Sequence, residues 1–190
     1  KEGKLPSIPA DFKGNLDVEA LELNIQKIGA KNIPAAILTI TNNSGGGQPV
    51  SMQNIREVRH ICSNHDIPLI IDCCRFAENA YFIKKREKGY DQKSISEIVM
   101  EIFSYADGAT MSAKKDAFSN MGGFLALKNE NLANECRNLL IITEGFTTYG
   151  GLSGRDLEAV AIGLQEIMDE SYLHYRIRSI EYLTEKLQSA

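Results

Sequence analysis

The stretches ADGATMSAKKDAFSN (Ala106–Asn120) and PLIIDCCR (Pro68–Arg75) decide the fold of this chain. In the first, Lys115 follows a short apolar run, and in the second, Asp72 ends a run of large aliphatic residues. Short apolar runs bounded by polar residues are typical of buried parallel strands, and ligands bind such sheets at the carboxyl ends of the strands. We therefore expect Asp72 and Lys115 to lie at the ligand-binding edge of a parallel sheet.

A lysine and a carboxylate at neighbouring strand ends are typical of a pyridoxal phosphate site. In such a site the lysine, here Lys115, forms a Schiff base, and the carboxylate, here Asp72, keeps the pyridine nitrogen protonated. Lys114 is a second cation that could lower the pKa of its neighbour, and Ser112 could donate to the cofactor phosphate. A plainer interpretation stays open at this point: the aspartate caps a loop, and the two lysines form a solvated surface pair.

Four longer segments resemble the β-eliminating lyases of the type I pyridoxal phosphate superfamily, the family of tryptophanase and tyrosine phenol-lyase. These segments are TNNSGGGQPVSM (Thr41–Met52), IDCCRFAENAYFIKKRE (Ile71–Glu87), MSAKKDAFSNMGGFLALK (Met111–Lys128) and EGFTTYGGLSGRD (Glu144–Asp156). The resemblance runs from DFKGNLD to YLTEKL, and RFAENAYFIK and YLHYRI look more like the tryptophanase branch. It implies an α/β fold, the partial large domain of a type I pyridoxal phosphate-dependent transferase. The sheet would be mostly parallel, with one antiparallel strand and helices on both faces.

The resemblance also implies roles for particular residues. The cofactor would be held by Lys115, Asp72, Arg75, Asn43, Ser112 and Lys114, and Lys115 would be the catalytic base. Arg75 would contact the phenolate oxygen of the cofactor, and Asn43 would lie near that oxygen and the substrate carboxylate. The backbone carbonyl of Asn120 would help to bind a monovalent cation, K⁺. From the residues alone, Arg75 could equally form a local salt bridge, and the Asn120 carbonyl could be an ordinary loop group.

The reaction implied by the resemblance is the β-elimination of L-tryptophan to indole, pyruvate and ammonia, with tyrosine phenol-lyase or another β-eliminating lyase as the alternative. The family's chains are much longer, so residues 1–14 are expected to be a linker or a cut edge and residues 15–190 a fragment of the cofactor-binding domain. Parts of the family's active site are missing from the matched motifs, and the 190 residues alone are expected to be inactive. The resemblance also implies a homo-oligomer, a tetramer in the full-length family.

The glycine-rich segment Asn42–Pro49 lies between a predicted strand and a predicted helix. Its three consecutive glycines, Gly45–Gly47, allow close approach of the backbone, and their N–H groups could bind an anion. The segment does not match the dinucleotide pattern GxGxxG. A non-catalytic nucleotide-binding α/β module is therefore a remote alternative, and a simple chain-reversing turn is another.

Composition narrows the class of protein. The chain has 190 residues, enough for one domain with a sizeable core, and 43% of them are hydrophobic. A net charge of −4 argues against nucleic-acid binding. We expect neither a membrane span nor a signal peptide, since no apolar run approaches about 20 residues and the N-terminus lacks an apolar core. The four cysteines form no CxxC pair, which favours reduced thiols in a cytoplasmic protein. The family resemblance implies that the substrate is a small amino acid.

Local signals predict the individual elements. A helix is expected over Val18–Ile28, because Asp17 can cap its start and Gly29 its end. Ser94 and Glu97 form a capping box before another helix. The strand predicted at Gly122–Leu127 follows its predecessor too closely for a parallel crossover, so we expect it to be antiparallel.

Two further expectations concern the C-terminal part of the chain. The residues Leu173, Ile177, Ile180 and Leu187 recur on one face of a predicted helix, and this stripe is expected to pack on the sheet or on a small domain. Tyr149, in the loop before these helices, is expected to be a packing aromatic or a contact to a neighbouring subunit.

Overall fold

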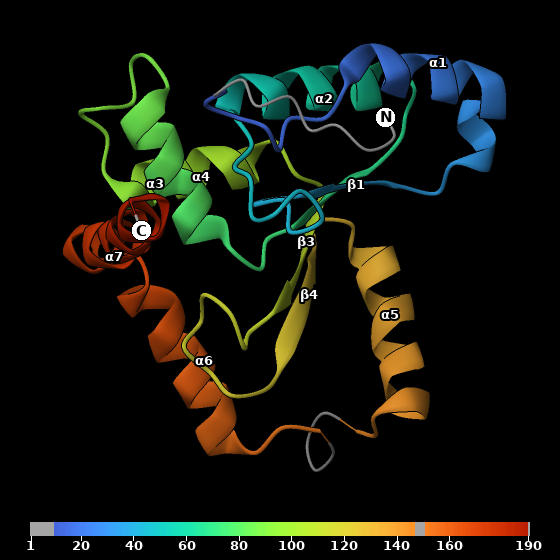
Figure 1. Cartoon of the computed structure of the whole chain (residues 1–190). Coiled ribbons are helices and arrows are strands. Elements are labelled where there is room, and N and C mark those ends of the chain that lie inside the picture. The colour runs from blue at the N-terminus through green and yellow to red at the C-terminus, as the bar shows by residue number, and fades with distance from the viewer. Residues whose placement is uncertain (1–9, 147–150, 190) are drawn as a thin grey trace.

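The computed structural model describes residues 10–146 and 151–189. These residues include a four-stranded sheet and the helices around it (Figure 1). The strands are β1 (Ala36–Thr39), β2 (Leu69–Asp72), β3 (Gly108–Ser112) and β4 (Gly123–Leu127). They lie side by side in chain order; β1, β2 and β3 are parallel, and β4 runs antiparallel to β3. The predicted fold class, an α/β structure with a mostly parallel sheet and one antiparallel strand, is therefore confirmed.

Seven α-helices and one short 3₁₀ helix connect and follow these strands in the described residues. They are α1 (Val18–Ile28), η1 (Ala30–Asn32), α2 (Met52–Asn64), α3 (Phe76–Arg86), α4 (Ile95–Ser104), α5 (Glu130–Thr143), α6 (Gly154–Glu166) and α7 (Glu170–Gln188). In Figure 1, β3 and β4 run between α3 and α4 on one side and α5 on the other. None of the helices in the described ranges is both long and apolar enough to cross a membrane.

Local capping chemistry determines where several helices begin and end. The Asp17 side chain accepts a hydrogen bond from the Ala20 N–H at 3.0 Å, and Gly29 ends α1 with a φ of 85°. In α4, both hydrogen bonds of the predicted capping box between Ser94 and Glu97 are present. Helix α1 therefore begins and ends, and α4 begins, where the sequence predicts.

The core lies between the sheet and α2, α3 and α4. Fully buried aliphatic side chains come from both layers, including Leu69 and Ile71 of β2, Ile55 of α2 and Ile98 of α4. Such burial supplies the main driving force for folding. By contrast, β4 is largely exposed, and Leu125 keeps 52% of its surface accessible. The sheet is therefore largely covered at β2 and β3 and open at β4.

The C-terminal helix α7 packs on α3 and not on the sheet. Lys84 and Glu170 form an ion pair at 2.6 Å, and the Tyr81 hydroxyl is hydrogen-bonded to His174 at 3.0 Å. Of the stripe that the sequence predicts, Leu173 is buried and Ile177 partly buried, whereas Ile180 and Leu187 are 56% and 70% exposed. In the described residues the stripe therefore packs in part on α3 and not on the sheet, and the alternative expectation, packing on a small domain, stays a prediction.

Two predictions fall wholly or partly outside the described residues. Tyr149 lies outside them, as do residues 1–9 of the predicted linker at 1–14. The described end of that linker is attached to the entry of α2, since the Gly14 N–H donates to the Pro49 carbonyl at 3.0 Å.

Candidate active site at the carboxyl edge of the sheet

Three parallel strands bring the predicted site residues to one edge of the sheet. In the registers of β1, β2 and β3, Asp72 lies between Thr39 and Thr110, so that the three strands end nearly level. Asn43 follows β1, Asp72 ends β2, and Lys115 follows β3. The carboxyl edge of a parallel sheet is where ligands of open α/β folds bind.

Asp72 is half-buried, and its carboxylate accepts only long hydrogen bonds within the described residues. The Thr39 hydroxyl and the Cys74 N–H each donate to one of its oxygens at a long 3.4 Å. Asp72 takes part in none of the ion pairs among residues 10–146 and 151–189. Its oxygens therefore retain lone pairs that can accept a hydrogen bond from a protonated ring nitrogen.

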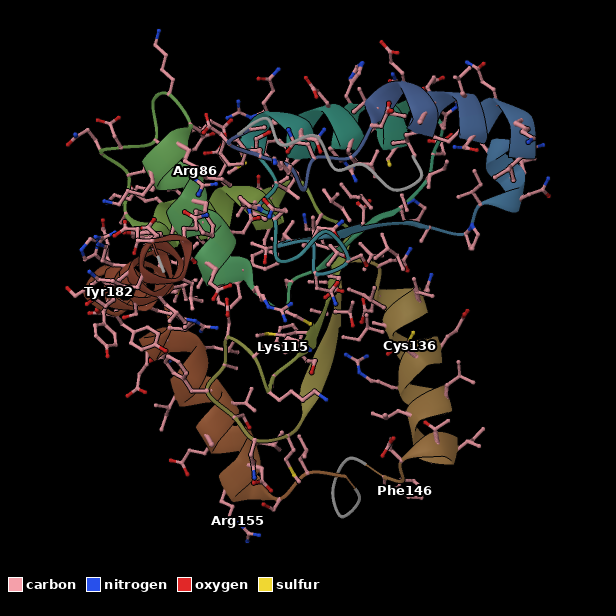
Figure 2. The ribbon with its side chains drawn as sticks, in the orientation of Figure 1. Arg86, Lys115, Cys136, Phe146, Arg155 and Tyr182 are labelled. Atoms are coloured by element: carbon pink, nitrogen blue, oxygen red, sulfur yellow. The ribbon has the colours of Figure 1, made fainter. Side chains whose placement is uncertain are left out.

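Lys115 lies in the loop between β3 and β4, which we call the lysine loop (Ala113–Gly122). Its side chain is half-buried, whereas Lys114 is exposed. Figure 2 shows Lys115 near the centre of the view, between Tyr182 of α7 and Cys136 of α5. In the part of the chain that the structure describes, Lys115 forms no ion pair, so its amine is available for chemistry.

Cys74 lies within electrostatic range of both charged residues. Burial raises the pKa of its thiol, and the Asp72 carboxylate adds to the rise, whereas the Lys115 ammonium opposes it. The carboxylate at the end of β2 and the amine that follows β3 thus both affect the pKa of the Cys74 thiol. Both groups belong to one local site.

Hydrogen bonds join the segment Asp72–Arg75, which we call the aspartate loop, to the end of β3, and the Asp116 N–H joins it to the lysine loop by donating to the Cys74 carbonyl at 3.3 Å. The Cys73 N–H donates to the Thr110 carbonyl at 2.9 Å, and the Ser112 N–H donates to the Cys74 sulfur at 3.1 Å. The two loops therefore form one connected unit, which sets the positions of Asp72 and Lys115 relative to each other.

The four cysteines are free thiols, as the sequence predicts: Cys62, Cys73, Cys74 and Cys136. Burial raises the pKa of Cys73 to about 12, so this thiol stays protonated beneath the site.

The glycine-rich segment is a self-contained turn. The Gly45 N–H donates to the Asn42 side chain at 3.1 Å, the Gly46 N–H to the Asn43 carbonyl at 3.1 Å, and the Gly47 N–H to the Asn42 carbonyl at 2.9 Å. Because these three N–H groups are already used, the segment does not offer them to a phosphate. This geometry argues against the nucleotide-binding alternative and leaves Asn43 exposed at the edge of the sheet.

Arg75 and Asn120 lie at the ends of the two loops. Arg75 is half-buried at the N-cap of α3, and it forms no salt bridge among the described residues, so the predicted alternative of a local ion pair is not observed there. Asn120 is exposed near the end of the lysine loop. Residues 10–146 and 151–189 contain no group of three or more His, Cys, Asp or Glu side chains suited to a metal ion.

A buried charge cluster behind Lys115 is absent from the sequence-based expectations. Asp116 is fully buried, and Arg176 of α7 lies 3.8 Å from its Oδ1 atom and 2.8 Å from the Glu78 carboxylate. Burial and the nearby Glu78 carboxylate raise the pKa of Asp116 to about 7. Its partners come from distant parts of the sequence, and Asp116 itself follows two lysines, so no local signal in the sequence could have found the cluster.

The fold and the edge geometry define an α/β domain whose lysine and aspartate stand at adjacent parallel strand ends, the class to which pyridoxal phosphate enzymes of fold type I belong. Comparison with known families is more specific than the fold alone. The sequence model of the β-eliminating lyase family matches residues 1–190. The chain belongs to the β-eliminating lyase family.

Individual relatives agree with this family. The chain is 57% identical over 185 residues to a tryptophanase of Salinibacter ruber and 49% identical over 185 residues to a tyrosine phenol-lyase of Lacrimispora saccharolytica. These alignments cover 97% of this chain but 39% and 40% of the two relatives, so the chain spans about two fifths of their length. Among solved structures, a pyridoxal phosphate-bound amine transaminase from an uncultivated Pseudomonas species is similar, with a TM-score of 0.48 and 22% identity over 80% of this chain and 31% of that one.

Proposed function

We propose that this chain is part of a pyridoxal phosphate-dependent β-eliminating lyase that converts L-tryptophan and water into indole, pyruvate and ammonia. The observation that carries the proposal is the placement of Asp72 and Lys115 at the ends of adjacent parallel strands, joined by the hydrogen bonds of their loops. The higher identity to the tryptophanase than to the phenol-lyase supports tryptophan as the substrate.

The two central residues have complementary roles. The cofactor, when bound, supplies an electron-accepting ring. Asp72 would pair with the ring nitrogen and favour its protonated form, and its weakly engaged oxygens suit this task. Lys115 would hold the cofactor covalently and then move the proton of the substrate's Cα atom.

The remaining predicted residues would contact other groups of the cofactor, the substrate or a cation. Arg75 would stabilise the phenolate oxygen of the cofactor, and Asn43 would lie near that oxygen and the substrate carboxylate. Ser112 and Lys114 would hold the phosphate. The Asn120 carbonyl would contribute to a site for a monovalent cation, K⁺ being the ion expected.

The proposal includes a longer chain and a homo-oligomer. Apolar side chains that a complete enzyme would cover are exposed here, including Leu125 on β4 and Ile142 on α5, the latter with 83% of its surface accessible. We place the enzyme in the cytoplasm, since its described cysteines are free thiols. A tetramer is the assembly that the resemblance implies.

The cofactor can be tested directly on the full-length protein. After incubation with pyridoxal phosphate, the absorbance spectrum is recorded before and after borohydride reduction, and the modified peptide is mapped by mass spectrometry. The proposal predicts an adduct on Lys115 that is lost in Lys115→Ala and retained in the control variant Lys31→Ala, since Lys31 is an exposed lysine of η1 with no proposed role in cofactor binding. Nicotinamide-nucleotide binding without uptake of pyridoxal phosphate would instead support a nucleotide-binding module.

The substrate is tested by product release. Full-length protein loaded with cofactor is expected to release indole from L-tryptophan faster than phenol from L-tyrosine. The reverse order would favour the second candidate, a tyrosine phenol-lyase, to which the chain is also similar. We expect the 190 residues alone to release no indole, because parts of the family's active site lie outside them, and measurable release would refute this expectation.

A further inference from the structure

Helix α3 follows directly after the aspartate loop, and its own sequence does not cap it. The N-cap position is Arg75, which makes no side-chain capping hydrogen bond. A guanidinium carries only donors and cannot accept from the free N–H groups of a first helical turn. Because Arg75 occupies the N-cap position, the free N–H groups at the start of α3 need a hydrogen-bond acceptor from another part of the chain.

Asp116 supplies that acceptor. Its Oδ2 atom accepts a hydrogen bond from the Ala77 N–H of α3 at 3.0 Å, and its own N–H donates to the Cys74 carbonyl in the aspartate loop at 3.3 Å. The carboxylate is fully buried, so water does not compete for these bonds.

Asp116 is the residue directly after Lys115, so the cap also fixes the backbone that carries the lysine. The start of α3 in turn fixes the aspartate loop, which carries Asp72 and Arg75. One carboxylate thus ties together the two loops that bear the predicted cofactor-binding groups.

Helix α7 holds this carboxylate from the opposite side. The Arg176 guanidinium lies 3.8 Å from Asp116 Oδ1, an atom without a hydrogen-bond partner among the described residues, and 2.8 Å from Glu78 of α3. Arg176 thereby lies between two acids that would otherwise repel each other. The lysine loop, α3 and α7 therefore meet at Asp116, which has specific partners on both helices.

We propose that Asp116 is a positioning residue that caps α3 from the lysine loop and so sets the geometry between Lys115, Asp72 and Arg75 required to bind the cofactor. This inference rests on the proposed function. It concerns a residue that contacts neither substrate nor cofactor in that proposal.

The test compares Asp116→Ala with Asp116→Asn in the full-length protein. Asparagine keeps an oxygen acceptor for the Ala77 N–H, whereas alanine removes it. The dissociation constant of pyridoxal phosphate is measured by absorbance under conditions where each variant is folded. We expect a rise of about ten-fold for Asp116→Ala and less than about three-fold for Asp116→Asn, as the loss or retention of one helix cap implies.

Hydrogen exchange of the cofactor-free protein provides a second readout. Peptides that cover residues 73–80 and 113–122 should exchange faster together in Asp116→Ala and remain protected in Asp116→Asn. The control is Ser94→Ala, which removes the exposed cap of the neighbouring helix α4 and should leave both cofactor affinity and these peptides unchanged.

The outcomes separate this inference from the proposed function. If the wild type binds no pyridoxal phosphate, the proposed function fails. If the wild type binds it and Asp116→Ala binds it equally well, the positioning role is refuted and Asp116 is only a structural cap. Should Asp116→Ala not fold, Asp116→Ser takes its place with the same expected and contrary results, because its shorter side chain does not reach the Ala77 N–H.

Discussion

Gly163 of α6 packs directly against the carbonyl group of Ala117 in the lysine loop. A Cβ atom at position 163 would lie 1.7 Å from the Ala117 oxygen and 2.6 Å from its carbonyl carbon. Both atoms belong to the backbone, so no flexible side chain can move aside. Position 163 therefore admits only glycine while α6 and the lysine loop keep their present contact.

The first prediction follows from this contact. Gly163→Ala should lower the free energy of unfolding by about 1–3 kcal/mol, since overpacking forces a backbone shift, despite the better helix propensity of alanine. Chemical denaturation followed by circular dichroism measures the effect. Gly154→Ala in the first turn of the same helix is the matched control, because its Cβ meets nothing within 4 Å. Equal stabilities of the two variants would contradict the close packing.

The second prediction concerns the pH dependence of stability that Asp116 causes. Its pKa is raised from an ordinary 3.8 to about 7 in the folded protein, where burial and Glu78 outweigh the Ala77 N–H and Arg176. Between these two values the folded state holds a proton that the unfolded state has lost. This contribution to stability is complete below about pH 4 and is lost as the pH rises through about 7.

Asp116→Asn removes this titration while it keeps the shape of the side chain. The stability of the variant relative to the wild type should therefore increase from pH 4 to pH 7 and level off above that, by at most about 4 kcal/mol for a shift of this size. Urea unfolding at several pH values measures the difference. A difference that does not change with pH would show that Asp116 has an ordinary pKa in the folded chain.

Much of the fold could be predicted because its signals are local. The start and end of α1 depend on Asp17 and Gly29, and α4 begins at the capping box of Ser94, all within one helical turn of the residues concerned. The antiparallel direction of β4 follows from the short connection before it. The meeting of three strand ends at one edge follows from the parallel order itself.

The supporting contacts could not be predicted, because each depends on residues that are distant in the sequence. Asp116 follows two lysines, a pattern typical of a solvated loop, and nothing nearby indicates that Ala77 and Arg176 would surround it. The regular apolar positions of α7 likewise predict a buried stripe, yet Ile180 and Leu187 are exposed in the described residues. Periodicity shows which residues share a face, but it does not show what covers that face.

The third prediction concerns Asn79, which holds the chain between the glycine-rich segment and α2. Its fully buried amide accepts from the Val50 N–H at 2.8 Å and donates to the Val50 carbonyl at 2.9 Å. Asn79→Ala leaves both backbone groups buried without partners and should cost about 2–5 kcal/mol in unfolding free energy. Asn24→Ala, which removes one exposed hydrogen bond, should change stability by less than about 0.5 kcal/mol. Equal effects in the two denaturation curves would contradict this role.

The fourth prediction concerns acid stability, which depends on Glu101 of α4. Although burial opposes its ionisation, hydrogen bonds from Lys93, Arg56 and Tyr90 lower its pKa from 4.5 to about 2. A lowered pKa stabilises the folded state above about pH 4.5, and this contribution is lost as the pH falls toward 2.

Glu101→Gln should therefore be less stable than the wild type at pH 7, by on the order of 1 kcal/mol, since Arg56 and Lys93 are both partly solvated. The difference should shrink below pH 4.5 and vanish near pH 2, where the wild-type carboxylate takes up its proton. Thermal or urea unfolding across this range measures it, with Glu181→Gln as the control, because the ion-pair partner of Glu181 among the described residues is the exposed Arg178 on α7. If the stability difference were the same at pH 2 and pH 7, Glu101 would act through packing and not through its charge.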